Sequence, residues 1–106
     1  MQVGISQLIA PDLGNEQFIE TARANGYDVV ELTMRQQGAL TGATTAAELD
    51  AIAAFARGCG VPIVSLTLNH WNGNLLAAGA EQDVAVQDTI AGLEAAARLG
   101  APVALH

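Results

Sequence analysis

The sequence contains no lysine, a single cysteine and few aromatic residues. It has four arginines and 11 acidic residues, so the formal net charge is −7. A nucleic-acid backbone would find few cations on such a chain, which disfavours nucleic-acid binding. The lone Cys59 cannot form an internal disulfide, and this is typical of a protein of the reducing cytoplasm.

Long apolar runs are also lacking. No stretch approaches the roughly 20 residues of a membrane helix, and no cationic start followed by an apolar segment resembles a leader. With 106 residues the chain has material for one hydrophobic core and not for two, so a single domain over residues 1–106 is expected. These absences predict a cytoplasmic protein that binds neither nucleic acid nor a membrane.

What the chain does contain is a pattern that recurs three times. Each copy runs from an arginine through a glycine into β-branched and leucine residues, and the copies are residues 22–32, 56–66 and 97–105. Gly26, Gly60 and Gly100 are about 34 and about 40 positions apart, the size of one strand-plus-helix unit. An arginine in the last helical turn, followed by a left-handed glycine, is typical of a helix end.

This repeat and the apolar periodicity predict four strands and three helices. The helices are expected at about 15–25, 45–59 and 80–99, and the strands at about 2–8, 29–34, 61–68 and 102–106. Thr45 and Glu48 have the spacing of a capping box at the start of the second helix. In the third helix an apolar stripe at helical spacing is expected to be the packing face. The stripe consists of Val86, Ile90, Leu93 and Ala97.

Connections of this length favour right-handed crossovers, so the four strands are predicted to be parallel, in the order 1-2-3-4, with all helices on one side. The fold class is α/β, and the arrangement is the parallel (βα)3β half of a TIM-type (β/α)8 barrel. A doubly wound sheet is the alternative. It would usually place a glycine-rich phosphate loop after the first strand, where residues 6–10 read Ser-Gln-Leu-Ile-Ala.

Alternation along the strands sorts side chains onto two faces, because in a β/α barrel the apolar set meets the helices and the other set lines the lumen. The predicted lumen set is Gly4, Ser6, Glu31, Thr33, Ser65, Thr67, Asn69, Ala104 and His106. The predicted helix-facing set is Val3, Ile5, Val30, Leu32, Val64, Leu66, Leu68, Val103 and Leu105. A glutamate among apolar residues needs a partner, so Glu31 is interpreted first as a structural hydrogen-bond centre and alternatively as catalytic.

The third strand ends in a polar exit, where Asn69, His70, Trp71 and Asn72 follow one another. The carboxyl ends of strands carry binding and chemistry in β/α proteins. Residues 26–32, the strand that leads to Asn69 and His70, and residues 97–103 resemble the first half of the xylose-isomerase-like TIM barrels. This family contains sugar and sugar-phosphate isomerases and epimerases, and it is related to abasic-site endonucleases.

The resemblance implies a divalent metal, Mn, Mg, Co or Zn, which polarises a ketose carbonyl while two carboxylates move a proton through an enediolate. In the family the usual metal ligands and catalytic glutamates come from later strands, so catalytic residues stay unassigned. The early-strand positions carry over. They imply contacts of a sugar or sugar phosphate with Glu31, Asn69, His70 and Trp71.

The endonuclease branch of the family implies in addition that His70 and His106 bind the metal. A catalytic zinc needs three protein ligands, so at least one carboxylate must come from elsewhere. The alternatives are that His70 is a loop histidine bonded to backbone and that His106 is an ordinary chain-terminal residue.

Two functions from different classes are therefore predicted. In the first, the chain is the amino-terminal fragment of a metal-dependent sugar or sugar-phosphate isomerase or epimerase. In the second, it is a complete half-barrel module that pairs with itself or with a separate second half and is not itself catalytic. In both cases the open edges of the first and fourth strands predict a homo-oligomer of the isolated chain.

Overall fold

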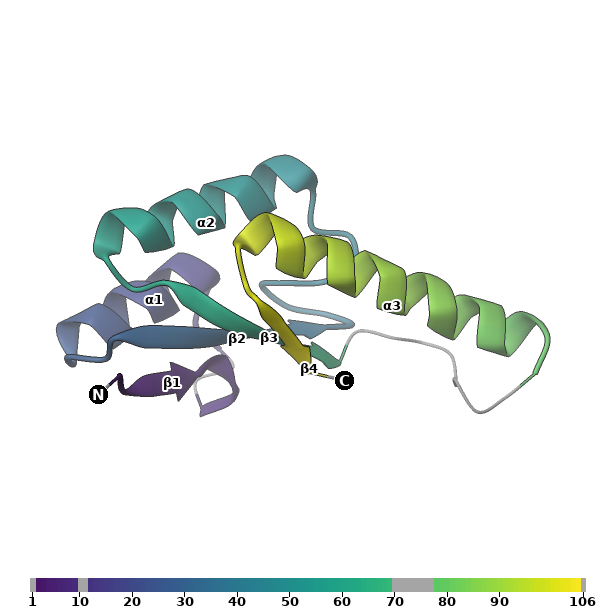
Figure 1. The fold of residues 1–106 in the computed structure, drawn as a ribbon, viewed down its shortest axis with the longest axis horizontal. Coiled ribbons are helices and arrows are strands. Elements are labelled where there is room, and N and C mark those ends of the chain that lie inside the picture. The colour runs from purple at the N-terminus through teal and green to yellow at the C-terminus, as the bar shows by residue number, and fades with distance from the viewer. Residues whose placement is uncertain (1, 10–11, 70–77, 106) are drawn as a thin grey trace.

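A four-stranded sheet carries three helices on one of its faces in the computed structural model, which describes residues 2–9, 12–69 and 78–105 (Figure 1). In chain order the elements are β1 (Gly4–Ser6), the 3₁₀ turn η1 (Gln7–Ile9), α1 (Asn15–Ala24), β2 (Val29–Arg35), α2 (Ala46–Cys59), β3 (Ile63–Asn69), α3 (Ala80–Leu99) and β4 (Val103–Leu105). Neighbouring strands are parallel and their order is β1-β2-β3-β4. The predicted order is confirmed, and the helices begin and end within one residue of their expected bounds.

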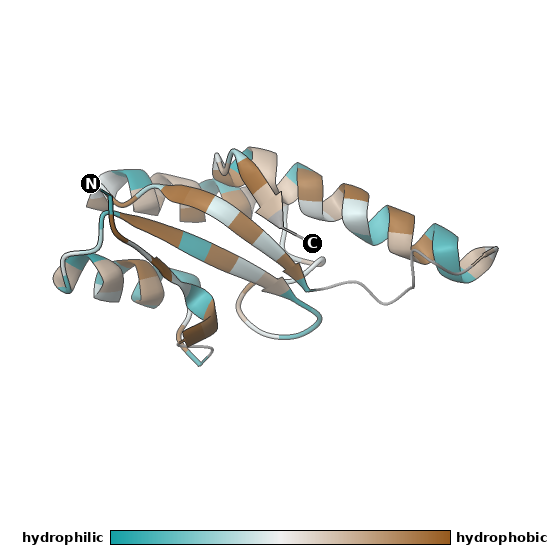
Figure 2. Cartoon of the chain, turned by 60° about the horizontal axis from the view of Figure 1, so that its bottom comes forward, coloured by the Kyte–Doolittle hydropathy of each residue, from teal (hydrophilic) through white to brown (hydrophobic). Residues whose placement is uncertain are grey.

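The hydrophobic core lies between the sheet and the helices. Large side chains of β2 and β3, such as Leu32 and Leu66, are fully buried against Phe18 and Ile19 of α1 and Ile52 of α2. Burial of each such side chain stabilises the fold by about 1.5–3 kcal/mol. No helix of residues 2–9, 12–69 and 78–105 covers the other face of the sheet, and in the turned view of Figure 2 the strands lie in front of the helices. We call this second face the open face.

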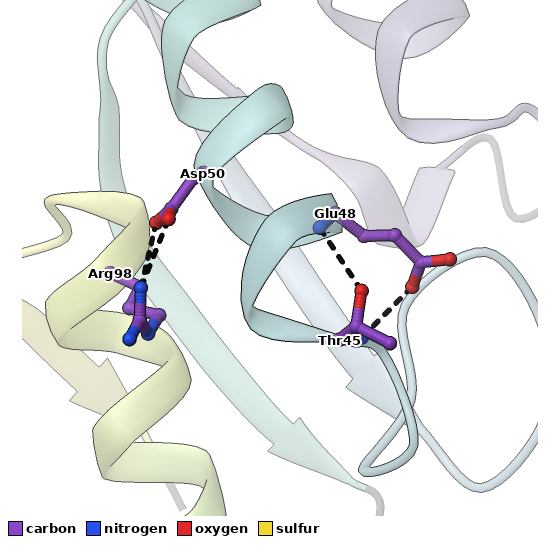
Figure 3. Close-up of polar contacts among 4 residues, drawn as sticks. All are labelled: Thr45, Glu48, Asp50 and Arg98. Carbon is purple, nitrogen blue, oxygen red and sulfur yellow. Dashed lines mark hydrogen bonds and ion pairs between the residues drawn. The ribbon is translucent and has the colours of Figure 1, made fainter.

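Both ends of α2 follow the chemistry that the sequence predicts. The Thr45 hydroxyl accepts a hydrogen bond from the Glu48 amide at 3.2 Å, and the Glu48 carboxylate accepts one from the Thr45 amide at 2.9 Å (Figure 3). At the other end Gly60 is left-handed, with φ 71°, as a helix stop requires. Asp50 of α2 and Arg98 of α3 form an exposed ion pair at 3.0 Å (Figure 3), which is worth at most about 1 kcal/mol.

The first strand is shorter than predicted. It ends at Ser6, because the chain turns into η1 and buries the Gln7 side chain. Val3, expected to face the helices, lies before β1 and is exposed.

Among the described residues no helix combines the length and the apolar character that crossing a membrane requires.

The predicted packing face of α3 is wrong. Val86, Ile90 and Leu93 are 40%, 43% and 53% exposed, and Ala97 is exposed with them. The buried face consists instead of Ala85, Gly92, Ala95, Ala96 and Leu99. Small side chains let the helix axis approach the sheet closely, so the larger residues are left on another side of the helix. We call Val86, Ile90, Leu93 and Ala97 the α3 outer stripe.

Two strand parities also differ from prediction. Between Val30 and Glu31 the β2–β3 register shifts, so that Val30 pairs with Ile63 and Glu31 with Ser65. Val64 is the extra residue of this bulge: Ile63 enters the core in its place, and Val64 lines a hollow beside Glu31.

In β4 the predicted faces of Val103 and Ala104 are exchanged. Val103 pairs with Ser65 and is exposed, while Ala104 pairs with Leu66 and packs against the core. Parallel partners share a face, so the register with β3 decides the side on which each β4 residue lies. The size of the side chains suggested the opposite assignment. The expectation that His106 lies in the lumen falls outside the described residues.

Candidate functional site

Glu31 joins three strands on the open face. The Ser6 hydroxyl donates to one carboxylate oxygen of Glu31 at 3.0 Å, and the Ser65 hydroxyl donates to the other at 2.6 Å. All three residues stand at one level of the sheet, because Ser6 pairs with Glu31 and Glu31 pairs with Ser65. The interpretation of Glu31 as a hydrogen-bond centre is confirmed, and its contact with a substrate stays a prediction.

The surroundings of Glu31 keep its carboxylate ionised. The hydrogen bond from Ser65 lowers the pKa of Glu31 most, and the hydroxyls of Ser6 and Thr67 act in the same direction against the opposing effect of burial. A general base works best with a pKa near the operating pH. At neutral pH Glu31 is therefore a fixed negative charge and a weak proton acceptor.

The hollow beside Glu31 lies toward the amino ends of the strands. It has a volume of about 250 Å³ and is lined by Gly4, Val29, Val64 and their strand neighbours, including Glu31 itself. In β/α barrels chemistry is placed at the carboxyl ends, whereas the amino ends serve stability. The position of Glu31, toward the amino ends of the strands, thus agrees with a structural role.

Asn69 is the other predicted site residue that the structure describes. It ends β3, is exposed, and pairs with Arg35 at the end of β2. Glu31 precedes Arg35 by four residues, a separation of about 13 Å along the strand at the usual rise per residue. Glu31 and Asn69 therefore belong to different levels of the sheet. His70, Trp71 and His106 lie outside the described residues.

A second polar group, not predicted from the sequence, occupies the carboxyl end of β1 and β2. Gln7 is 5% exposed. Its side-chain oxygen accepts a hydrogen bond from the Thr33 backbone amide at 2.9 Å, and its side-chain nitrogen donates one to the Asn15 side-chain oxygen at 2.9 Å. Asn15 in turn donates to the backbone oxygen of Ala39 at 2.8 Å. This chain of hydrogen bonds ties η1, β2, α1 and the loop after β2 together.

Thr33 and Arg35 belong to the same end of β2. Thr33 is 2% exposed, and its side-chain oxygen has no hydrogen-bond partner among the described residues. Arg35 is half-buried, and its backbone amide donates to the Leu40 carbonyl at 2.9 Å. A hollow of about 40 Å³ is bounded by both residues together with Gln7 and the loop residues 37–40. The signal in the sequence was the continuation of the period-two pattern from Glu31 to Thr33 and Arg35.

A larger hollow lies away from the open face. It measures about 580 Å³ and is bounded by the start of α1 (residues 14–17), the loop 38–44 and the first turns of α2. Its carboxylates are Glu16 and Glu48, and the second of these is engaged in the capping box. The volume of this hollow therefore does not identify it as a functional site, and the polar residues at the strand ends are better candidates.

The described residues do not by themselves fit a divalent metal. Within residues 2–9, 12–69 and 78–105 no three His, Cys, Asp or Glu side chains are grouped as a metal ion requires. Glu31 is on the open face, but both of its oxygens already accept hydrogen bonds from serine hydroxyls. The predicted ligands His70 and His106 are outside the described part of the chain.

Comparison with known proteins gives a structural match. No protein-family model and no curated protein matches the sequence. A solved structure, a xylose isomerase domain containing protein from Salmonella typhimurium LT2, superposes with a TM-score of 0.65 at 22% sequence identity. The chain has a xylose-isomerase-like fold. The match covers 94% of this chain and 34% of the Salmonella protein, so the chain spans about a third of that length and corresponds to part of a barrel.

Proposed function

We propose that this chain is the amino-terminal part of a metal-dependent sugar or sugar-phosphate isomerase or epimerase. The observation that carries the proposal is an open polar sheet face, on which Glu31 accepts hydrogen bonds from Ser6 and Ser65, in a fold shared with a xylose isomerase domain containing protein. The sugar would lie over the carboxyl ends of the strands, against Asn69, His70 and Trp71. We assign the protein to the cytoplasm because its cysteine is unpaired.

The chemistry divides between this chain and residues outside it. Isomerisation through an enediolate needs a base that takes a proton from one carbon and returns it to the next. Glu31 is unsuited to that step, because its pKa is lowered and it stands about 13 Å below the strand end. On this proposal Glu31 holds the first three strands in register, and the proton-transferring carboxylates come from later strands.

The metal part of the proposal rests on His70 and His106. Two imidazoles need a third ligand from a carboxylate outside the described group before a catalytic ion is held. Calorimetric titration of the chain with manganese, cobalt and zinc is the test. Weak binding that His70→Ala removes, and that the exposed control Glu20→Gln leaves unchanged, supports the ligand assignment.

A ketose–aldose interconversion assay tests the division of labour. The purified chain is expected to show no turnover, because the described strand ends contain no pair of carboxylates. Turnover that survives replacement of Glu31, His70 and His106 would sink the assignment and move the active site to other residues.

A second candidate function is a half-barrel module that pairs with another half. The observation that favours it is the α3 outer stripe, whose Val86, Ile90 and Leu93 are each at least 40% exposed, with exposed Val103 on the neighbouring edge strand. The ridge of apolar side chains on one side of α3 is the surface such a pairing would cover. A second copy of the chain is the simplest partner, since a two-fold pair would bring two open faces together.

A further inference from the structure

We propose that Arg35 and Thr33 form a binding site for the carboxylate group of a small molecule at the carboxyl end of β2. The function proposed above assigns no role to either residue, and this inference stands on the geometry of the site alone. It therefore holds or fails whether or not the protein isomerises sugars.

Arg35 differs from the other three arginines in its position. Arg23, Arg57 and Arg98 each lie in the last turn of a helix, where a cation suits the helix dipole. Arg35 instead ends a strand, half-buried. Among the described residues the only ion pair is that of Arg98 with Asp50, so Arg35 has no carboxylate partner there. In a chain of net charge −7, a half-buried cation without such a partner is suited to bind an anion.

Thr33 supplies the second, independent observation. Its backbone amide is already bound by Gln7, whereas its buried hydroxyl has no partner among the described residues. Buried polar groups are nearly always hydrogen-bonded, and each exception calls for an explanation. Thr33 and Arg35 line the same hollow, so rotation of the Thr33 side chain about χ1 would bring its buried hydroxyl to an acceptor oxygen bound there beside the guanidinium.

The size and lining of the hollow favour a carboxylate. Its volume of about 40 Å³ exceeds the roughly 10–15 Å³ that one water-sized group needs. It thus accommodates a small polar group such as a carboxylate. The lining contains no acidic residue. The planar guanidinium fork matches a carboxylate with two parallel hydrogen bonds.

The walls of the hollow are held in place before any ligand binds. Gln7, Asn15 and Ala39 form the hydrogen-bond chain described above, and the Arg35 amide closes the loop onto Leu40. Gly38 has a φ of +122°, a conformation that other residues adopt only with strain, and it shapes the turn over the hollow. A site that is already ordered loses less entropy on binding.

The test is NMR titration of the ¹⁵N-labelled full chain with sodium acetate and with glycolate at constant ionic strength. We expect saturable shifts of the Thr33, Arg35 and Leu40 amides and of the Arg35 side-chain N–H. Arg35→Gln is expected to weaken binding about tenfold or more, the loss expected for a charged hydrogen bond. Thr33→Val is expected to weaken it about threefold to tenfold, as for a neutral one. The matched control Arg57→Gln, at a helix end, leaves the affinity unchanged.

Arg35→Lys keeps the positive charge and removes the guanidinium fork. Dispersed amide signals in the NMR spectrum show that each variant is folded. Weaker binding by Arg35→Lys than by the wild type supports the fork. Equal binding by this variant, no saturable shift at all, or equal shifts at Arg23 and Arg57 would each overturn the proposal. Tighter binding of inorganic phosphate than of acetate would overturn the assignment to carboxylates.

Discussion

The Ser65 hydroxyl donates to the Glu31 carboxylate at 2.6 Å across the β2–β3 pair, one residue after the bulge that sets their register. A slip of one residue would turn Ser65 to the helix face and remove this hydrogen bond. Ser6 makes the matching contact from β1 at 3.0 Å. The polar centre of the open face therefore also specifies how the first three strands align.

Glu31→Gln is expected to lower the free energy of unfolding at pH 7 by about 1–3 kcal/mol, because the charge of the acceptor that strengthens both serine hydrogen bonds is lost. Urea denaturation measures the difference. The control Glu20→Gln, on the exposed side of α1, is expected to stay within about 0.5 kcal/mol of the wild type. Equal stability of Glu31→Gln and the wild type would show that the charge of Glu31 contributes nothing to the free energy of unfolding.

The contribution of Glu31 depends on pH in a defined direction. Its pKa is lowered in the folded chain, chiefly by the hydrogen bond from Ser65, and returns to its ordinary value on unfolding. The stabilisation is thus fully present above the unfolded pKa and is lost as the pH falls through the lowered folded pKa. The gap between wild type and Glu31→Gln should narrow as the pH is taken from 6 down past 4. A gap that widens on acidification would contradict the sign of the shift.

Thr33→Val is expected to leave stability unchanged or to raise it by up to about 1 kcal/mol, because it removes a buried hydroxyl without a partner among the described residues. The matched substitution Ser65→Ala removes a hydroxyl that is bound to Glu31, and it should cost about 1–2 kcal/mol. Thermal unfolding of both variants gives the comparison. A large loss in Thr33→Val would mean that its hydroxyl is already engaged in the unliganded protein.

Thr45→Ala removes the side-chain half of the α2 capping box and is expected to cost about 1 kcal/mol. Glu48→Gln keeps an oxygen that reaches back to the Thr45 amide, so it should cost less than half as much. Chemical denaturation distinguishes the two. The reverse order of costs would indicate that the charge of Glu48, and not the cap, stabilises this helix end.

The sequence predicted best what local chemistry determines. The Thr45 cap, the left-handed stops at Gly60 and Gly100, and the parallel strand order all follow from short-range patterns, and the structure has them. The parity of β2 likewise placed Glu31 on the open face, where the structure has it.

The incorrect predictions concern residues whose burial depends on packing between elements. Ile90 and Leu93 have helical spacing, but the sheet accepts the smaller face of α3 with Ala95 and Ala96. The bulge at Val64 is invisible to a period of two, because it depends on pairing with β2. Arg35 was not predicted for a related reason: it lacks a carboxylate partner among the described residues, which no spacing in the chain reveals.

The central claim is that this chain is one part of a barrel, with surfaces that another barrel segment covers. Sedimentation velocity over a wide range of protein concentrations tests it most directly. The wild type is expected to associate as its concentration rises, and Ile90→Glu with Leu93→Glu on the α3 outer stripe should shift it to monomer. The control Val84→Glu, an equally exposed position on another side of α3, should associate like the wild type. A wild-type chain that stays monomeric at every concentration and unfolds cooperatively on heating would contradict the claim.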